Sequence, residues 1–317
     1  MLIAGYGPLT LSLMNIDQVQ LSPTGPALSR IVAGTMTWGE WGADYPPTQM
    51  AEMIGYCLEL GITSFDHADI YGHYSTEETF GAALHQLGTS VRTQTQLVTK
   101  CGIRLETNRR PDNRLKSYDL SRDYIVASAE RSLRNLKTDY LDLFLLHRPS
   151  PLMKPAEVAE AFAHLKDSGK VRAFGVSNFT PSQFALLEDV TPLVTNQVEC
   201  HPLHSDAFYD GTFDQLLGRS IRPMVWSPLG GAAYFKGEST FVLRLRDTVK
   251  TMAKKYGDVG EDVILLAWLL RHPASPVPVV GTTKKSRLNA TRLALEIELE
   301  MQDWFAILAA ARGREVA

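Results

Sequence analysis

The sequence has few cysteines and no excess of one charge, and so lacks the features that mark disulfide-rich and nucleic-acid-binding proteins. Only three of its 317 residues are cysteine, and these lie far apart, at Cys57, Cys101 and Cys200. Three scattered cysteines cannot build a disulfide framework, so the composition favours a reducing compartment such as the cytoplasm. An excess of one charge is also lacking, because 32 Lys and Arg stand against 35 Asp and Glu. This balance gives no electrostatic reason to expect nucleic acid or an anionic membrane as a partner.

The N-terminal stretch lacks the marks of a targeting or spanning segment. Residues 2–14 are apolar but interrupted by Gly and Pro, and they are too short to span a bilayer. No Lys or Arg precedes them and no small-residue cleavage site follows, which argues against a secretory signal peptide. We expect residues 1–15 to be a loose extension, or Met14 to be the natural start, and residues 16–317 to form one domain.

What the sequence does have is a repeating pattern of strand and helix. Hydrophobic residues make up 44% of the chain, enough for a sizeable core. Short apolar segments alternate with segments of helical periodicity. Strands are predicted at 30–34, 63–67, 96–101, 141–147, 173–177, 194–199, 222–227 and 277–281. Helices are predicted at 48–60, 76–86, 122–136, 155–168, 180–188, 212–217, 261–271 and 284–293.

This alternation predicts the fold class. Strands that alternate with helices pair in parallel through right-handed crossovers, and eight such units close into a (β/α)8 TIM barrel. A doubly wound open sheet is the competing architecture. Residues 102–121 and 230–256 extend the loops after the third and seventh strands, and the second of these ends in a helix. Barrel enzymes build their sites on this side of the barrel.

Four residues with complementary chemistry follow the second, third and fourth predicted strands. They are Asp66, Tyr71, Lys100 and His147, and in a barrel they would meet at one rim. A Tyr hydroxyl with a pKa near ~10 is a poor acid at neutral pH, and an adjacent ammonium is expected to lower that pKa. An Asp keeps the Lys charged, and a His can polarise a carbonyl group. The set can protonate an oxygen atom while a hydride reaches carbon.

At these residues the sequence resembles the aldo-keto reductase family, from about residue 28 to about residue 293. The family's catalytic tetrad is Asp, Tyr, Lys and His in that order, with the Tyr five residues after the Asp. Asp66, Tyr71, Lys100 and His147 match it one by one. The resemblance implies NADPH-dependent reduction of an aldehyde or ketone to an alcohol, with Tyr71 as the general acid. It implies a small carbonyl compound as partner, and it leaves the oligomeric state open.

The resemblance also implies a set of cofactor contacts. The family's Ser-Asn pair and Gln that hold the nicotinamide carboxamide match Ser177, Asn178 and Gln197, and its aromatic residue before a Ser-Pro-Leu-Gly loop matches Trp226. Further positions are implied in the loops after the first, seventh and eighth strands. The whole set is Thr35, Met36, Asp66, Ser177, Asn178, Gln197, Trp226, Ser227, Leu229, Gly281, Thr282 and Arg287.

The adenosine end departs from the family pattern. The family often has Lys-Ser after the eighth strand and an Arg five residues beyond the Ser. The Lys-Ser pair and the Arg bind the 2′-phosphate of NADPH. Here Gly281 and Thr282 stand at the first two positions and Arg287 is kept. Because a phosphate attracts any nearby cation, Lys284 or Lys285 is the expected substitute for the missing Lys. The departure puts the preference for NADPH over NADH in question.

The substrate pocket is expected to be aromatic and moderately polar. Its predicted lining is Trp38, Trp41, Tyr71 and His147, and aldehydes are the first choice of substrate by resemblance. Two other functions stay open. One is a nucleotide-sensing regulatory subunit with slow turnover. The other is a metal-dependent barrel hydrolase, since the short spacing of His201 and His204 is compatible with metal ligation, although no metal is expected here.

Overall fold

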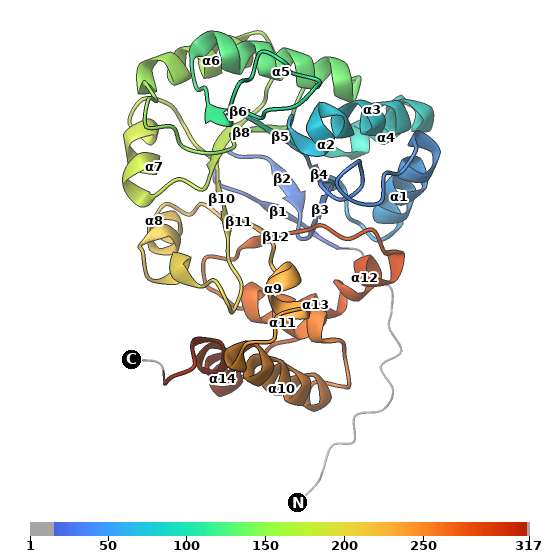
Figure 1. The fold of residues 1–317 in the computed structure, drawn as a ribbon, viewed down its shortest axis with the longest axis vertical. Helices are drawn as coiled ribbons and strands as arrows, with labels where there is room; N and C mark the ends of the chain where they lie inside the picture. The colour runs from blue at the N-terminus through green and yellow to red at the C-terminus, as the bar shows by residue number, and fades with distance from the viewer. Residues whose placement is uncertain (1–15, 316–317) are drawn as a thin grey trace, which may run out of the picture.

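In the computed structural model, which describes residues 16–315, the eight predicted strands form a closed parallel barrel (Figure 1). The strand order is β10-β11-β12-β3-β4-β5-β8-β9. The (β/α)8 barrel is therefore confirmed, and pairing of the last strand with the first excludes the open doubly wound sheet. The barrel strands are β3 (Val32–Gly34), β4 (Ser64–Asp66), β5 (Gln96–Cys101), β8 (Leu143–Leu146), β9 (Phe174–Ser177), β10 (Asn196–Glu199), β11 (Met224–Trp226) and β12 (Val277–Val280). The predicted extension over residues 1–15 lies outside the described residues.

The eight predicted helices surround the barrel (Figure 1). Their ends lie within a few residues of those predicted, and Pro155 begins its helix as the φ of proline allows. They are α1 (Pro47–Glu59), α3 (Thr76–Leu87), α5 (Arg122–Leu136), α6 (Pro155–Asp167), α7 (Pro181–Glu188), α8 (Thr212–Gly218), α11 (Glu261–Leu270) and α12 (Lys285–Ala290). Shorter helices are α2 (Tyr71–Tyr74), α4 (Thr89–Gln94), η1 (Asp206–Phe208), α9 (Gly231–Phe235) and α13 (Leu293–Glu296).

Two helices lie together outside the ring of strands (Figure 1). Helix α10 (Thr240–Lys255) is the one predicted at the end of the long seventh loop. It packs against α14 (Met301–Arg312), where Arg244 Nε donates to the carbonyl oxygen of Ala310 at 3.0 Å. The sequence analysis did not predict α14, because this helix follows the eighth strand–helix unit and belongs to no repeat.

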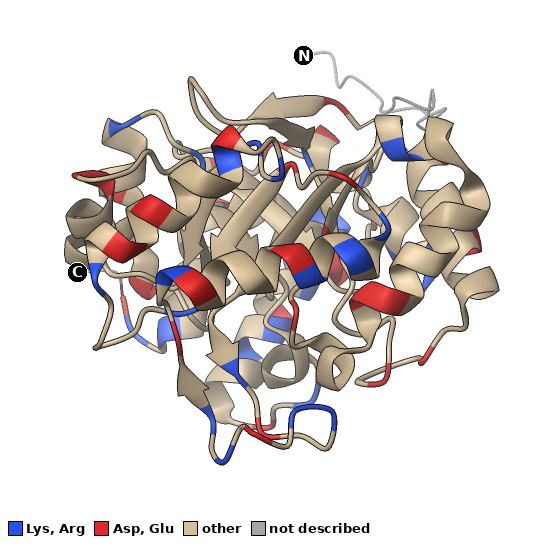
Figure 2. Cartoon of the chain, turned by 90° about the horizontal axis from the view of Figure 1, so that it is seen from above, with Lys and Arg blue, Asp and Glu red and all other residues tan. Residues whose placement is uncertain are grey.

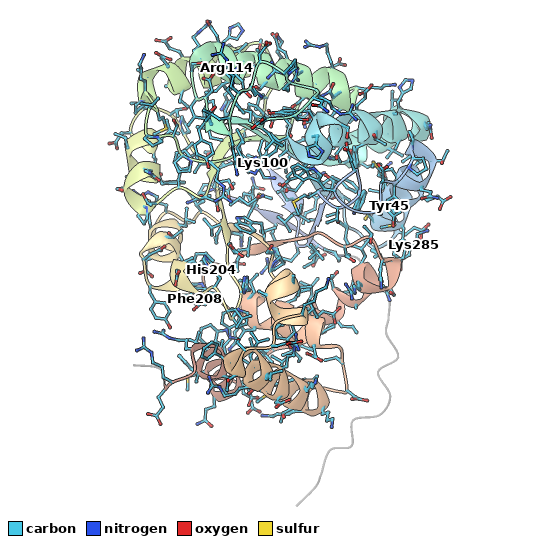
Figure 3. The ribbon with its side chains drawn as sticks, viewed as in Figure 1. Tyr45, Lys100, Arg114, His204, Phe208 and Lys285 are labelled. Atoms are coloured by element: carbon cyan, nitrogen blue, oxygen red, sulfur yellow. The ribbon has the colours of Figure 1, made fainter. Side chains whose placement is uncertain are left out.

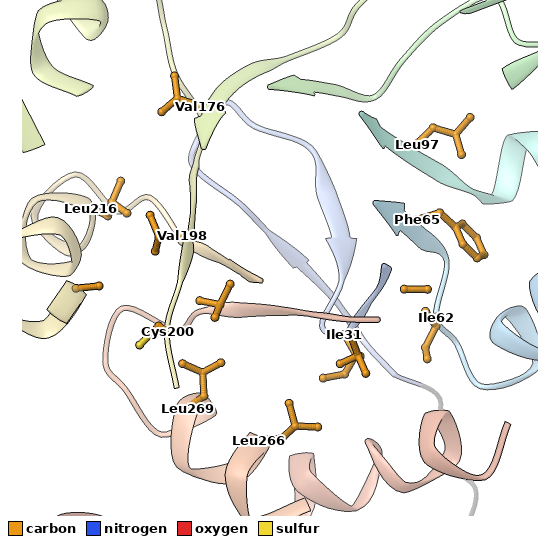
Figure 4. Close-up of a cluster of buried hydrophobic side chains, with 14 of the residues drawn as sticks. Ile31, Ile62, Phe65, Leu97, Val176, Val198, Cys200, Leu216, Leu266 and Leu269 are labelled. Atoms are coloured by element: carbon orange, nitrogen blue, oxygen red, sulfur yellow. The ribbon is translucent and has the colours of Figure 1, made fainter. Parts of the chain in front are cut away.

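Apolar side chains form two layers, one inside the barrel and one between the strands and the helices. Leu143 and Leu145 belong to the inner layer, whereas Phe144 and Leu146 belong to the outer one. Both faces of β8 are therefore buried, as expected from its nearly continuous apolar sequence. Figure 4 shows the outer layer where α11 packs against the strands, with Leu266 among the labelled residues.

A two-stranded hairpin covers the amino-terminal end of the barrel. It consists of β1 (Gln18–Gln20) and β2 (Ala27–Ser29), which pair antiparallel. Leu21 and Leu28 are fully buried in the inner apolar layer. Because the hairpin closes this end, the cavity described below opens from the other end, where the carboxyl ends of the strands lie.

The surface carries both signs of charge. Figure 2 shows acidic and basic residues interspersed along the surface helices. Among residues 16–315, no helix is long and apolar enough to cross a membrane.

The packing of α3 on α5 leaves no room for a side chain at Gly81. A Cβ at this position would stand 2.0 Å from the carbonyl oxygen of Asn135, whereas one at Gly55, inside α1, would meet nothing within 4 Å. We expect Gly81→Ala to lower the free energy of unfolding by about 2–3 kcal/mol, because the two helices must separate. We expect Gly55→Ala to raise it by about 0.5–1 kcal/mol through helix propensity. Urea denaturation measures both, and equal effects of the two substitutions would contradict this account of the packing.

Candidate active site

The carboxyl ends of the strands open into a cavity of about 950 Å³. Its lining comes from the carboxyl ends of the barrel strands and the loops that follow them, together with residues of α11, and it includes Trp41, Tyr71 and Arg287. All the residues predicted to contact the cofactor line it except Thr35. Of the predicted substrate-pocket residues, Trp41, Tyr71 and His147 line it and Trp38 does not.

At the centre of the barrel mouth lies a buried ion pair (Figure 3). Lys100 Nζ donates to Asp66 Oδ2 at 2.6 Å, to the carbonyl oxygen of His67 at 2.7 Å and to the Tyr71 hydroxyl at 3.2 Å. Gln197 Nε2 donates to the other carboxylate oxygen of Asp66 at 2.8 Å. An ammonium has three hydrogens to donate, so this ion pair leaves none of them without an acceptor.

The backbone after Tyr71 turns sharply. Gly72, His73 and Tyr74 have φ values of 56°, 52° and 73°, all in the left-handed region. For a residue with a side chain this conformation costs roughly 1–2 kcal/mol, and such strain gathers at functional sites. Tyr71 is thereby held beside the cavity by a constrained turn, with its ring 6.0 Å from that of Trp41.

The acidity of Tyr71 differs from what the sequence predicts. Burial raises the pKa of the Tyr71 hydroxyl above its ordinary value, and the nearby Lys100 ammonium offsets this only in part. The expected lowering is therefore wrong for the protein without ligand, because desolvation of the phenolate outweighs its attraction to Lys100. Burial acts to lower the pKa of Lys100, but the charges and hydrogen bonds of Asp66 and Tyr71 raise it above its ordinary value. The unit thus holds a protonated phenol beside a charged ammonium.

His147 is the fourth member of this group. Its ring centre lies 6.1 Å from that of Tyr71, and its Nδ1 is buried without a hydrogen-bond partner among the described residues. Burial, followed by the charges of Lys100 and Arg148, holds the pKa of His147 well below its ordinary value. His147 is therefore a neutral imidazole, which can donate one hydrogen bond without adding a charge.

Beside the ion pair, a chain of hydrogen bonds holds a pair of polar residues and an indole. The Ser177 hydroxyl donates to the carbonyl oxygen of Gln197 at 2.8 Å, and Asn178 Nδ2 donates to Ser177 Oγ at 2.8 Å. Trp226 Nε1 donates to Asn178 Oδ1 at 3.0 Å. The orientation of the indole is thus set by the same residues that line the cavity floor.

The cavity lining also includes two cations and, from α11, the carboxylate of Asp262. Arg287 and Lys236 line the cavity, together with Ala290 and Thr291. The two expected substitute cations do not. Lys284 is absent from the lining, and Lys285 Nζ lies 5.3 Å from the centre of the Tyr56 ring instead. Lys236 was missed by the sequence analysis because it lies in the long seventh loop, whose path no local pattern predicts.

Two predicted lining residues are placed elsewhere. Trp38 is fully buried against Phe65 and Phe80, because its indole packs in the layer between strands and helices. Thr35 is fully buried too, and its hydroxyl donates to the carbonyl oxygen of Asp66 at 3.0 Å. Neither residue lines the cavity in this structure, so the substrate contact predicted for Trp38 and the cofactor contact predicted for Thr35 gain no support from it.

Two further cations line the cavity near the ion pair and were missed. Arg148 follows His147 directly and lies 5.7 Å from the centre of the Trp226 ring. Lys116 comes from the loop between β5 and α5, where β6 (Ile103–Arg104) and β7 (Ser117–Tyr118) form a short hairpin. The only signal for Arg148 was its position beside His147, and Lys116 had none beyond its place in a long loop.

The histidines do not form a metal site. His201 Nε2 lies 3.2 Å from Glu199 Oε1, and the rings of His201 and His204 are 6.0 Å apart. Among residues 16–315, no three His, Cys, Asp or Glu residues are placed to hold a metal ion. The metal-dependent alternative therefore has no ligand set in the part of the chain that the structure describes.

These features define a class of protein, a (β/α)8 barrel whose ionisable residues gather where barrel enzymes have their active sites. Comparisons with known proteins go further. The model of the aldo/keto reductase family matches residues 30–312. Oxidoreductase YdhF of Escherichia coli (strain K12) is 44% identical over 95% of this chain and 99% of its own. A 6-dehydroglucose reductase of Agrobacterium fabrum is 41% identical over 92% of this chain and 96% of its own.

A solved structure agrees with these matches. The thermostable aldo-keto reductase Tm1743, in complex with the inhibitor epalrestat, is 26% identical and superposes with a TM-score of 0.77, over 92% of this chain and 99% of its own. The chain belongs to the aldo-keto reductase family. It is thus an oxidoreductase, in a family that generally uses a nicotinamide cofactor.

The raised pKa of Tyr71 has a direct spectroscopic consequence. Since the folded protein favours the phenol, the hydroxyl keeps its proton up to and beyond its ordinary pKa of 10.0. We expect the tyrosinate absorbance of the protein without ligand, minus that of Tyr71→Phe, to stay at zero until the pH exceeds about 10. A difference signal that titrates in the neutral range would show that Lys100 outweighs burial.

Proposed function

We propose that the protein reduces an aldehyde or ketone to an alcohol with NADPH as the reductant and Tyr71 as the general acid. The observation that carries this proposal is the 3.2 Å contact between Lys100 Nζ and the Tyr71 hydroxyl at the cavity wall. It joins a proton donor to a fixed positive charge. This pairing supports catalysis over the alternative of a slow regulatory subunit. The cytoplasmic location stays a prediction.

The cavity lining fits a nicotinamide dinucleotide. One end offers the amide and hydroxyl groups of Ser177, Asn178 and Gln197 beside the indole of Trp226, which suits a flat ring with a carboxamide. The other end offers Arg287, which suits a phosphate. The remaining contacts would come from Met36, Ser227, Leu229, Gly281 and Thr282. The chemistry that this cofactor supplies when bound is hydride donation to a carbonyl carbon.

The residues around Tyr71 handle the proton. The Tyr71 hydroxyl transfers its proton to the carbonyl oxygen and becomes a phenolate, which the Lys100 ammonium stabilises at hydrogen-bond distance. Asp66 keeps Lys100 charged and in place. His147, as a neutral imidazole, donates a hydrogen bond to the same carbonyl oxygen and so orients the substrate. The burial that raises the pKa of Tyr71 also strengthens each of these interactions, since the site is shielded from water.

The substrate end favours a compound with several oxygen atoms. Lys116 and Arg148 line it, and hydroxyl or carboxylate oxygens are the partners that such donors bind. A relative at 41% identity is named 6-dehydroglucose reductase. We therefore propose that the substrate is a hydroxylated carbonyl compound such as a sugar aldehyde. Apolar lining from Trp41 and Ile103 would cover its carbon skeleton.

Removing the Tyr71 hydroxyl tests the proposed mechanism. We expect Tyr71→Phe to lower kcat by at least about 100-fold, because general acid catalysis is lost. NADPH affinity should stay within about twofold of the wild-type value, because the hydroxyl acts on the transition state. Steady-state kinetics and fluorescence titration measure the two effects. A loss of NADPH binding equal to the loss of activity would contradict the assigned role.

A second test addresses the cofactor. Quenching of tryptophan fluorescence should report NADPH binding next to Trp226 and should be much weaker with NADH at equal concentration. We expect Arg287→Ala to weaken NADPH binding about 10- to 100-fold, since a charge-assisted hydrogen bond to phosphate is lost, and to leave NADH binding nearly unchanged. Equal affinity for both cofactors in the wild type would refute the NADPH preference, and no binding of either would refute the proposed function.

The substrate class is tested with aldehydes of equal length. Wild-type kcat/KM should be at least about 10-fold higher for glyceraldehyde than for propanal, because Lys116 and Arg148 bind hydroxyls that propanal lacks. Lys116→Met should reduce this ratio toward one, whereas Lys154→Met, on an exposed lysine paired with Glu157, should not change it. A ratio unaffected by Lys116→Met would remove this residue from the substrate site.

A further inference from the structure

Three successive backbone carbonyl groups after β12 accept hydrogen bonds from side chains of a single loop, the one between β3 and α1. The Thr37 hydroxyl donates to the carbonyl oxygen of Gly281 at 3.2 Å. The indole Nε1 of Trp38 donates to that of Thr282 at 3.0 Å, and the Tyr45 hydroxyl donates to that of Thr283 at 2.7 Å. The β12–α12 loop, residues 281–284, is thus bound along its length by the loop between β3 and α1.

The barrel explains why these two loops meet. Strands β3 and β12 are neighbours, with Val32 opposite Val279 and Ala33 opposite Val280. Their carboxyl ends lie side by side, so the loops that follow run next to each other. Figure 3 shows Tyr45 and Lys285 close together at this edge of the molecule.

The donors themselves are rigidly placed. The amide of Trp38 donates to the carbonyl oxygen of Thr35 at 3.0 Å, and the amide of Tyr45 donates to that of Trp38 at 2.8 Å. The Trp38 ring is fully buried against Phe65 and Phe80, whose ring centres lie 6.2 and 6.4 Å from its own. The three donors therefore form a fixed template, and the loop that they bind has to follow it.

The loop in turn places the residues that face the cavity. The amide of Lys284 donates to Thr282 Oγ1 at 3.2 Å, and the amide of Arg287 donates to the carbonyl oxygen of Lys284 at 3.0 Å, which starts α12. Gly281, Thr282 and Arg287 all line the cavity. The three carbonyl oxygens, each a centre of partial negative charge, are drawn toward the β3–α1 loop.

We propose that Thr37, Trp38 and Tyr45 are positioning residues that set the selectivity for the 2′-phosphate of NADPH. The inference rests on the proposed use of NADPH and deepens it. Trp38 and Tyr45 do not line the cavity and act only through the loop that they bind, whereas Thr37 both binds this loop and lines the cavity. All three turn carbonyl oxygens away from a dianionic group that these oxygens would repel, and they fix the start of the helix that carries Arg287. Because the loop is already ordered before the cofactor binds, cofactor binding does not include the entropic cost of ordering it.

Isosteric substitutions test the proposal, because they remove the donor and keep the shape. We expect Tyr45→Phe, at a residue that does not line the cavity, to raise the Kd for NADPH about threefold, and the double variant Thr37→Val/Tyr45→Phe to raise it about 10-fold, at roughly threefold for each lost hydrogen bond. The Kd for NADH should rise by less than about twofold, because NADH has no 2′-phosphate. The matched control is Tyr56→Phe, since the Tyr56 hydroxyl makes no hydrogen bond to any described residue although Lys285 lies over its ring.

The outcomes separate the proposal from the function on which it rests. A fall in the ratio of the NADH Kd to the NADPH Kd in Tyr45→Phe, and a larger fall in the double variant, but none in Tyr56→Phe, supports the positioning role. An unchanged ratio, or equal weakening for both cofactors, overturns it while leaving NADPH use intact. A wild-type protein that fails to prefer NADPH overturns the proposed cofactor instead. Thermal denaturation shows whether the double variant is folded, and Tyr45→Phe alone, with an expected threefold effect, serves if it is not.

Discussion

The ion pair between Lys100 and Asp66 is the constraint on which the rest of the site depends. Moving two charges out of water is costly, and the cost is recovered only if every donor and acceptor is satisfied. Here the partners come from three strands and one turn, since Gln197 of β10, the carbonyl of His67 and the hydroxyl of Tyr71 complete the set. Satisfying this one pair therefore fixes the relative positions of the groups that line the barrel mouth.

Burial governs the chemistry of the neighbouring residues as well. Desolvation, with the nearby Lys100 charge, lowers the pKa of His67 to about 3, and burial raises that of Cys101 well above its ordinary value. Both residues are thus neutral, and Cys101 is an unreactive thiol, as its apolar setting suggests. The same desolvation leaves Tyr71 protonated. The barrel mouth therefore combines one charged pair, Lys100 and Asp66, with two neutral imidazoles, His67 and His147, and one acid that keeps its proton, Tyr71.

Local patterns in the sequence predicted the barrel well, and they selected four candidate residues that the structure brings together. The eight strands could be recognised because each is a short apolar run between turn residues, and the alternation with helices leaves few topologies. These four candidates could be selected because Asp66 and Lys100 lie at the carboxyl ends of β4 and β5, and Tyr71 and His147 come soon after the ends of β4 and β8. Patterns failed where contacts are made between distant loops. Nothing near Trp38 indicates that its indole is buried and bonded to the carbonyl of Thr282, and nothing near Lys116 indicates that it reaches the cavity.

By itself, the sequence determined the order of the elements, the closure into eight units and the identity of the reactive groups, since periodicity and residue chemistry are local properties. Only the tertiary structure decided how acidic Tyr71 is, because its pKa follows from burial balanced against one ammonium. Likewise, only the tertiary structure decided which cations face the cavity. Lys236 does and Lys285 does not, although both belong to segments rich in Lys and Arg, because side-chain direction depends on how neighbouring segments pack.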